Sequence, residues 1–99
     1  MSPMGKREMI AENREKILDV AQRHGVASIR LIGSVARGDE DEESDIDFLV
    51  RMEPGRSLLD MGGLLLDLEE LLGCKVDVVS EGGLRARFRE RALREAVSV

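Results

Sequence analysis

Two aspartates open an apolar segment of the chain, and their spacing predicts a metal site. The sequence there reads DIDFLV, so that Asp45 and Asp47 alternate with Ile46 and Phe48. Side chains along a strand alternate in direction, which would place both carboxylates on one face and the apolar residues on the other. Two neighbouring carboxylates repel each other unless a proton or a cation lies between them. Mg²⁺ fits this place, because it prefers carboxylate oxygens.

A third carboxylate interrupts a later apolar segment, since Asp77 stands within the sequence KVDVVS. If its strand lies beside the strand that follows Asp45, all three carboxylates can reach one site. Such a set could hold two metal ions about 4 Å apart, as in phosphoryl and nucleotidyl transfer. The simpler alternative is structural: Asp45 caps its strand, Asp47 faces solvent and Asp77 pairs with a nearby arginine.

A possible phosphate-binding element precedes these acids. Gly33 and Ser34 stand where a predicted strand gives way to a short helix. Glycine lets the backbone approach a ligand closely, and N–H groups at a helix start attract phosphate. Ser34 adds a hydroxyl, and the guanidinium of Arg37 is suited to phosphate oxygens. A phosphate cradle beside a metal site is the arrangement that a nucleoside triphosphate needs.

Together these segments resemble a known family. GSVARG (33–38), ten residues between Ser34 and Asp45, DIDFLV and the later Asp77 look like the nucleotidyltransferase superfamily that includes DNA polymerase beta. The short chain is similar to its minimal nucleotidyltransferases, and the similarity extends to the tail LRARFRERALREAVSV. The resemblance implies Mg²⁺ ligands at Asp45 and Asp47, a third carboxylate at Asp77 that helps activate the acceptor hydroxyl, contacts of Gly33 and Ser34 with the β and γ phosphates, and an auxiliary phosphate contact at Arg37.

The resemblance also implies a partner and a reaction. Minimal members typically occur with a small helical protein of the HEPN class, as antitoxin and ribonuclease toxin, and transfer AMP from ATP to a tyrosine of that toxin. This chain contains no tyrosine, so its own tyrosine cannot be the acceptor. An antitoxin that acts by binding alone is the alternative from another class. Transfer to RNA or to a small molecule such as an aminoglycoside is a weaker one, because basic grooves, stacking aromatics and a second domain are lacking. No residue is an evident reader of the nucleobase.

The elements that position these residues follow from apolar spacing and from turn residues. The pattern predicts an α/β (α+β) domain, with a short mixed sheet of three to four strands flanked by helices. Gly62 and Gly63 weaken the third predicted helix by about 2 kcal/mol, so either it begins at Leu64 or some backbone or ligand approaches there. Strands are expected over 26–32, 45–51 and 75–79, and helices over 8–24, 35–37, 57–72 and 84–96, with Leu84, Phe88 and Ala92 on one face of the last.

Composition limits the class of protein. The chain has 99 residues, a formal charge of −5 and 42% apolar residues, which predicts one domain over 1–99. Its acidic balance argues against nucleic acid as the main partner. One cysteine and no membrane-spanning segment favour a cytoplasmic location. Asp39 to Glu43 are expected in a solvated loop, His24 in a structural role at a helix end, and Cys74 as a buried side chain.

Overall fold

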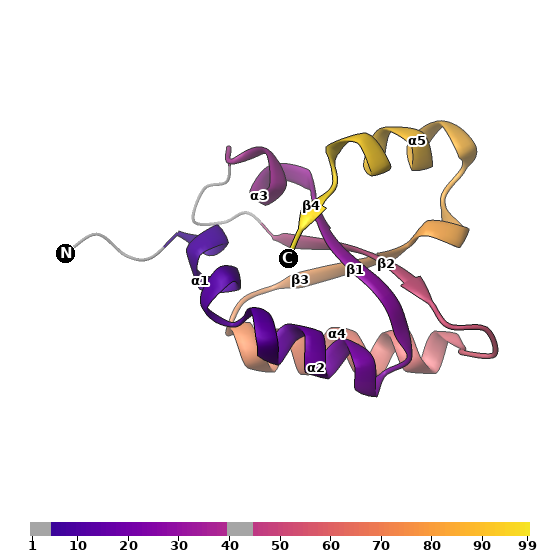
Figure 1. Cartoon of the computed structure of the whole chain (residues 1–99), viewed down its shortest axis with the longest axis horizontal. Helices are drawn as coiled ribbons and strands as arrows, with labels where there is room; N and C mark the ends of the chain where they lie inside the picture. Colours follow the sequence, from indigo (N-terminus) through magenta and orange to yellow (C-terminus); the bar gives the residue numbers. More distant parts are fainter. Residues whose placement is uncertain (1–4, 40–44) are drawn as a thin grey trace.

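The computed structural model describes residues 5–39 and 45–99, and it shows a mixed sheet packed between two layers of helices (Figure 1). Residues 40–43 of the predicted acidic loop lie outside the described part. The strands are β1 (Val26–Ile32), β2 (Ile46–Met52), β3 (Val76–Ser80) and β4 (Val97–Ser98). The helices are α1 (Lys6–Glu12), α2 (Arg14–Arg23), α3 (Gly33–Arg37), α4 (Leu58–Leu72) and α5 (Ala86–Glu95), and a 3₁₀ turn, η1, spans Glu81–Gly83.

The four strands form one sheet in the order β3-β2-β1-β4. β1 is antiparallel to both β2 and β4, whereas β2 and β3 are parallel. This mixed sheet of four strands confirms the predicted fold class. The parallel pair is made possible by α4, which connects β2 to β3 across one face of the sheet.

The main core lies between the sheet and the helices α2 and α4, which run together along one face (Figure 1). Ile46, Phe48 and Val50 of β2 are completely buried there against Leu64 and Leu68 of α4. The intervening residues of β2 turn to the other face, on the side of α3 and α5. The alternation of DIDFLV therefore separates core residues from candidate site residues, as the sequence predicted.

The N-terminal helix is broken into two, and the prediction of one helix over 8–24 was wrong. Asn13 ends α1, and its side-chain amide donates a 2.8 Å hydrogen bond to the carbonyl oxygen of Met9. Asparagine competes in this way with helical backbone pairing, so it favours helix ends over helix interiors. The chain changes direction there, and α2 packs on the sheet while only Ile10 of α1 is buried.

α4 runs without interruption through Gly62 and Gly63, so a start at Leu64 is excluded. The group that approaches Gly63 is a side chain, neither backbone nor ligand: a Cβ there would lie 2.8 Å from Cε1 of His24. The ring of His24 packs over this glycine, and its Nε2 lies 2.6 Å from Oδ2 of Asp67. The structural role expected of His24 is therefore the linkage of α2 to α4. Apart from the backbone of α4 itself, no described atom lies within 4 Å of the Cβ position of Gly62.

Other differences from the sequence prediction are small. The last helix is shorter than 84–96, because η1 and an extended Leu84 precede it and the two-residue strand β4 follows it. Cys74 is partly exposed instead of buried, although the burial that remains raises the pKa of its thiol. Among residues 5–39 and 45–99, no helix has both the length and the apolar character needed to cross a bilayer.

Candidate functional site

Asp47 and Asp77 are direct neighbours across the parallel pair of strands. The register of β2 and β3 places Asp47 opposite Asp77. Partners in register point to the same face of a sheet, so the two carboxylates share the face opposite the main core. Asp45 lies one residue before β2 and is half-buried. The expected adjacency of the second and third strands is confirmed.

The electrostatics of Asp47 tie the predicted residues to one place. Burial raises the pKa of the Asp47 carboxyl above its ordinary value of 3.8, and the negative charges of Asp77 and Asp45 raise it further. The guanidinium of Arg37 acts in the opposite direction and lowers the pKa. Asp77 has no ion-pair partner in the described residues, so the simpler reading in which an arginine neutralises it is not supported.

Gly33 is required by the close approach of Asp47. Its φ of 76° lies in the left-handed region, and a Cβ at this position would collide with Oδ2 of Asp47. The register explains the contact, because Ile32, the residue before Gly33, is paired with Asp47. The backbone at the start of α3 therefore lies directly against the carboxylate, with half-buried Ser34 next in the chain.

Arg37 closes α3 and connects it to the last helix. Its Nε lies 3.3 Å from Oδ2 of Asp39, and its Nη1 lies 3.4 Å from Oε2 of Glu95 in α5. Glu95 also pairs with Arg91 at 3.4 Å. Both carboxylate partners of Arg37 are on the surface, where such pairs contribute little stability. A triphosphate could therefore compete for this guanidinium at low cost.

The donor set suits a hard cation such as Mg²⁺. Within the described part of the chain, no three carboxylate, imidazole or thiol groups converge into a ready-made metal cage. Mg²⁺ does not require one, because it typically binds one or two carboxylates and completes its shell with water and substrate phosphates. The mutual repulsion at Asp47 is the observation that fits a cation at this place.

A groove of about 310 Å³ opens beside the carboxylates, between the sheet and α5. It begins at Ile32 and Gly33, and Val79 of its lining lies two residues after Asp77, on the same face of β3. Phe88 borders the groove and is 55% exposed, whereas Phe48, the chain's other aromatic residue, is fully buried. The sequence predicted that Leu84, Phe88 and Ala92 lie on one face of a helix. It did not predict what that face covers. The groove is lined by Ile32, Gly33, Arg37, Val79, Leu84, Phe88, Arg91, Ala92 and Glu95.

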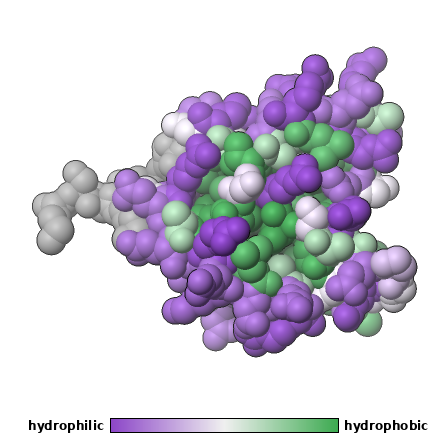
Figure 2. Space-filling view, in the orientation of Figure 1, coloured by the Kyte–Doolittle hydropathy of each residue, from purple (hydrophilic) through white to green (hydrophobic). Residues whose placement is uncertain are grey.

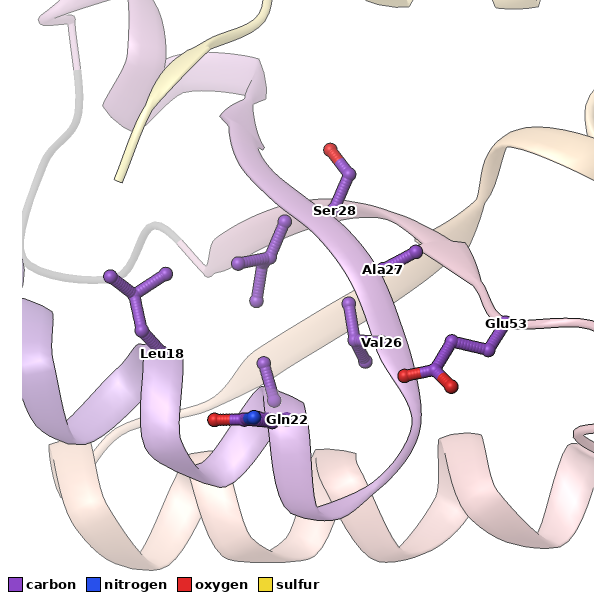
Figure 3. A pocket seen from close by; sticks show the side chains of 8 residues that line it. Leu18, Gln22, Val26, Ala27, Ser28 and Glu53 are labelled. Carbon is purple, nitrogen blue, oxygen red and sulfur yellow. The ribbon is translucent and has the colours of Figure 1, made fainter.

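A second groove, of about 510 Å³, runs between α2 and the other end of β1 (Figure 3). Figure 2 shows hydrophobic residues gathered in the middle of this face, where β1 runs, with hydrophilic residues around them. Leu18, Val26 and Glu53 line this groove. β1 reaches Gly33 only at its opposite end, so the second groove is separate from the carboxylate site.

Comparison with known proteins agrees with this geometry. Residues 14–99 match the family described as the nucleotidyltransferase domain. The chain is 41% identical over 81 residues to the protein adenylyltransferase MntA of Thermococcus cleftensis, covering 82% of each chain. It is 42% identical over 90 residues to a protein of Methanocaldococcus jannaschii named for the same activity, covering 91% of this chain and 97% of the relative.

Solved structures with the same fold are also similar to this chain. A structure described as a minimal nucleotidyltransferase superposes with a TM-score of 0.89 at 49% identity, over 100% of both chains. A toxin-antitoxin structure with AMP-PNP superposes with a TM-score of 0.74, over 86% of this chain and 70% of that one. Its identity is 22%, so that likeness shows the fold alone. On the family match and the curated relatives, the chain belongs to the nucleotidyltransferase family and is a small nucleotidyltransferase.

Proposed function

We propose that this enzyme transfers AMP from ATP to a tyrosine of a HEPN-class ribonuclease toxin and thereby acts as its antitoxin. The observation that carries the proposal is the pairing of Asp47 with Asp77 against the backbone of Gly33. Relatives named protein adenylyltransferases support the choice of AMP. The solved toxin-antitoxin structures of the same fold support a toxin as the partner.

Asp45, Asp47 and Asp77 would hold Mg²⁺. When bound, Mg²⁺ would neutralise the phosphates and stabilise charge on the attacking and leaving oxygens. Asp77 accepts the proton of the acceptor hydroxyl, whose oxygen then forms a bond to the α-phosphorus. The bond from the α-phosphorus to the bridging oxygen breaks, and pyrophosphate leaves. Most of the catalysis by the chain is positioning and electrostatic stabilisation.

The groove beside Gly33 supports the proposal that the nucleotide binds there. Gly33 and Ser34 contact the β and γ phosphates, and Arg37 exchanges a surface ion pair for a phosphate contact. The nucleoside then extends under α5, where the exposed ring of Phe88 offers a stacking surface for the base. A volume of about 310 Å³ is at the lower end of the range for small-molecule sites.

Mass measurement of the toxin tests the proposal directly. The protein is incubated with ATP, Mg²⁺ and a HEPN-class toxin that contains tyrosine, and we expect the toxin to gain one or more AMP units and lose ribonuclease activity. A toxin variant with phenylalanine in place of the acceptor tyrosine is the control and stays unmodified. Inhibition of the toxin without added mass would show an antitoxin that acts by binding alone, and the transfer proposal would be wrong.

A further inference from the structure

The arginines of this chain fall into two groups. The members of one group donate to a backbone carbonyl or pair with a carboxylate, and they are Arg7, Arg14, Arg23, Arg37, Arg56 and Arg91. The members of the other group are exposed and make no ion pair with another described residue. They are Arg30, Arg51, Arg85, Arg87, Arg89 and Arg94. The second group is therefore available to a binding partner.

The arginines of the second group lie on the side of the sheet that carries Asp47 and Asp77. Arg51 is four residues after Asp47 on β2, so strand alternation directs it to the same face. Arg30 is paired in register with Leu49, two residues after Asp47, and it shares that face too. The others belong to α5 or to its N-cap, and α5 lies over this face (Figure 1). A partner on this side of the sheet can reach both these cations and the carboxylates.

α5 carries its arginines at a cost in stability. Arg87, Arg91 and Arg94 follow one another at intervals of four and three residues, so they share one side of the helix, where like charges destabilise it. Arg85, Arg87 and Arg89 lie at its beginning, near the positive end of the helix dipole, and no acidic residue occurs in the first turn. No residue of α5 is buried, so core packing does not offset this repulsion. Anionic groups of a partner would reduce it.

We propose that the arginine surface, formed by Arg30, Arg85, Arg87, Arg89 and Arg94, binds an acidic segment of the acceptor protein. This role rests on the proposed function, because the acceptor is the protein whose hydroxyl must reach Asp77. Carboxylates of the acceptor pair with the guanidinium groups and hold the hydroxyl at the site. The arginine surface thus adds a property of the acceptor to the proposed function: acidic residues near the hydroxyl that is modified.

The arginine surface adjoins the groove beside the carboxylates. Arg91 lines this groove, and Arg87 and Arg94 lie on the same side of α5, about 6 Å before it and about 4.5 Å after it along the helix axis. β4 follows α5 in the chain, and its Ser98 is paired with Arg30, which connects the end of the helix to the sheet. A partner bound here approaches the carboxylates directly. A partner bound to α2 or α4 would be separated from them by the sheet.

The charges among these arginines favour a protein over a nucleic acid. Glu90 lies between Arg87 and Arg94, is exposed and makes no ion pair with another described residue. A phosphate backbone carries a negative charge at every nucleotide, so it would meet Glu90 as well as the arginines, and Asp47 and Asp77 would repel it nearby. A protein can place carboxylates opposite the arginines and other side chains opposite Glu90. The formal charge of −5 also opposes nucleic acid binding.

Binding measured without nucleotide tests the arginine surface separately from transfer. Isothermal titration calorimetry gives the affinity for a HEPN-class toxin that contains tyrosine and for a short polyglutamate peptide. We expect R87E/R94E to weaken both interactions at least about tenfold, and added salt to weaken wild-type binding. R87Q/R94Q, which removes the charges without reversing them, should show a smaller loss. Unchanged toxin binding in R87E/R94E would overturn the proposal, as would a wild type that binds neither the toxin nor the peptide.

K16E is the matched control for the change in charge. Lys16 is also exposed and makes no ion pair with another described residue, but it lies on α2, on the other side of the sheet. Circular dichroism establishes that each variant is folded. Equal weakening by K16E would show an effect of net charge alone and overturn the proposal. Tighter binding of polyuridylate RNA than of polyglutamate would overturn it in favour of a nucleic acid.

The kinetics of AMP transfer show whether these arginines act on the acceptor or on ATP. We expect R87E/R94E to raise the KM for the toxin at least about tenfold and to leave kcat and the KM for ATP nearly unchanged, because neither residue lines the groove. An equal rise in the KM for ATP would show that the arginines hold the triphosphate, and the proposal would be wrong. If the toxin binds through these arginines but gains no AMP from the wild type, the contact is supported and the proposed transfer is refuted.

Discussion

Asp47 faces Asp77 across two parallel strands; burial raises the pKa of the Asp47 carboxyl, and the negative charge of Asp77 raises it further. The negative charges of Asp77 and Asp45 both disfavour the charged form of the Asp47 carboxyl. Folding brings these charges together at a cost, which indicates that the site is arranged for a ligand that the chain alone does not supply.

Asp47→Asn should abolish transfer and leave the fold intact, as should Asp45→Asn. We expect activity to fall by more than about 100-fold, because loss of even an outer partner of a metal ligand costs 10- to 100-fold. Because the folded-state pKa of Asp47 is raised, its charge disfavours the folded state at neutral pH, so the melting temperature should stay equal or rise. Transfer is measured with labelled ATP, and Asp19→Asn, at a surface ion pair on α2, is the control. Full activity in Asp47→Asn would contradict the assignment.

Two glycines allow the contact between Gly33 and Asp47 to be tested separately from backbone strain. Gly33 and Gly38 have φ values of 76° and 79°, so alanine at either position should cost about 1–2 kcal/mol of stability. Only at Gly33 would the new Cβ meet Asp47, since no atom of the described residues lies within 4 Å of the Cβ position at Gly38. We therefore expect Gly33→Ala to lose transfer and Gly38→Ala to retain it, both measured well below their melting temperatures. Equal losses would show that strain alone is responsible.

Phe88→Ala should raise the KM for ATP and reduce the preference for one nucleobase. Stacking of a base on an aromatic ring contributes about 1–3 kcal/mol, which corresponds to a KM increase of about 5- to 150-fold. Phe88→Trp should preserve binding. Leu93→Ala is the control, because Leu93 is on the same helix but does not line the groove. An unchanged KM in Phe88→Ala would place the base elsewhere and leave the transfer reaction itself unaffected.

The start of α4 should make stability depend on pH in the acid range. The Ser57 backbone N–H donates a 2.9 Å hydrogen bond to Asp60, and this bond, with help from Arg56, lowers the pKa of the Asp60 carboxyl below 3.8. A lowered carboxyl pKa contributes stability that is present above pH 3.8 and is lost as the pH falls through the folded-state pKa. The difference in melting temperature between wild type and Asp60→Ala should therefore shrink below pH 3.8. A constant difference would mean that the charge of Asp60 does not contribute.

Alanine substitutions at the adjacent glycines of α4 should differ in their effect on stability. In dilute protein, Gly62→Ala should raise the free energy of unfolding by about 1 kcal/mol, because alanine favours helix and the space there is open. Gly63→Ala should give no such gain, because its Cβ would lie 2.8 Å from the ring of His24. Chemical denaturation at low concentration measures both. A gain in both variants would mean that the His24 ring moves aside at little cost.

The sequence was most informative where charged side chains stand within apolar segments. Asp47 and Asp77 interrupt apolar strands, and strand periodicity together with the expected adjacency of the two strands predicted that they share a face. The position of Phe88 beside the groove could not be predicted in the same way, because an amphipathic helix shows which face is apolar but not what that face covers. The break at Asn13 was missed because apolar spacing continues through it, while a side-chain hydrogen bond competes with the helix. Gly63 looked like a defect until the ring of His24, 39 positions earlier in the chain, was placed over it.

The alternation along β2 separates two kinds of mutational sensitivity within one short segment. Substitutions at Ile46 and Phe48 remove core packing and should reduce how much folded protein accumulates in a cell. Substitutions at Asp45 and Asp47 should leave the amount of protein unchanged and remove only its effect on the toxin. A mutational scan that scores abundance and protection separately would therefore switch from one phenotype to the other at every residue from 45 to 48.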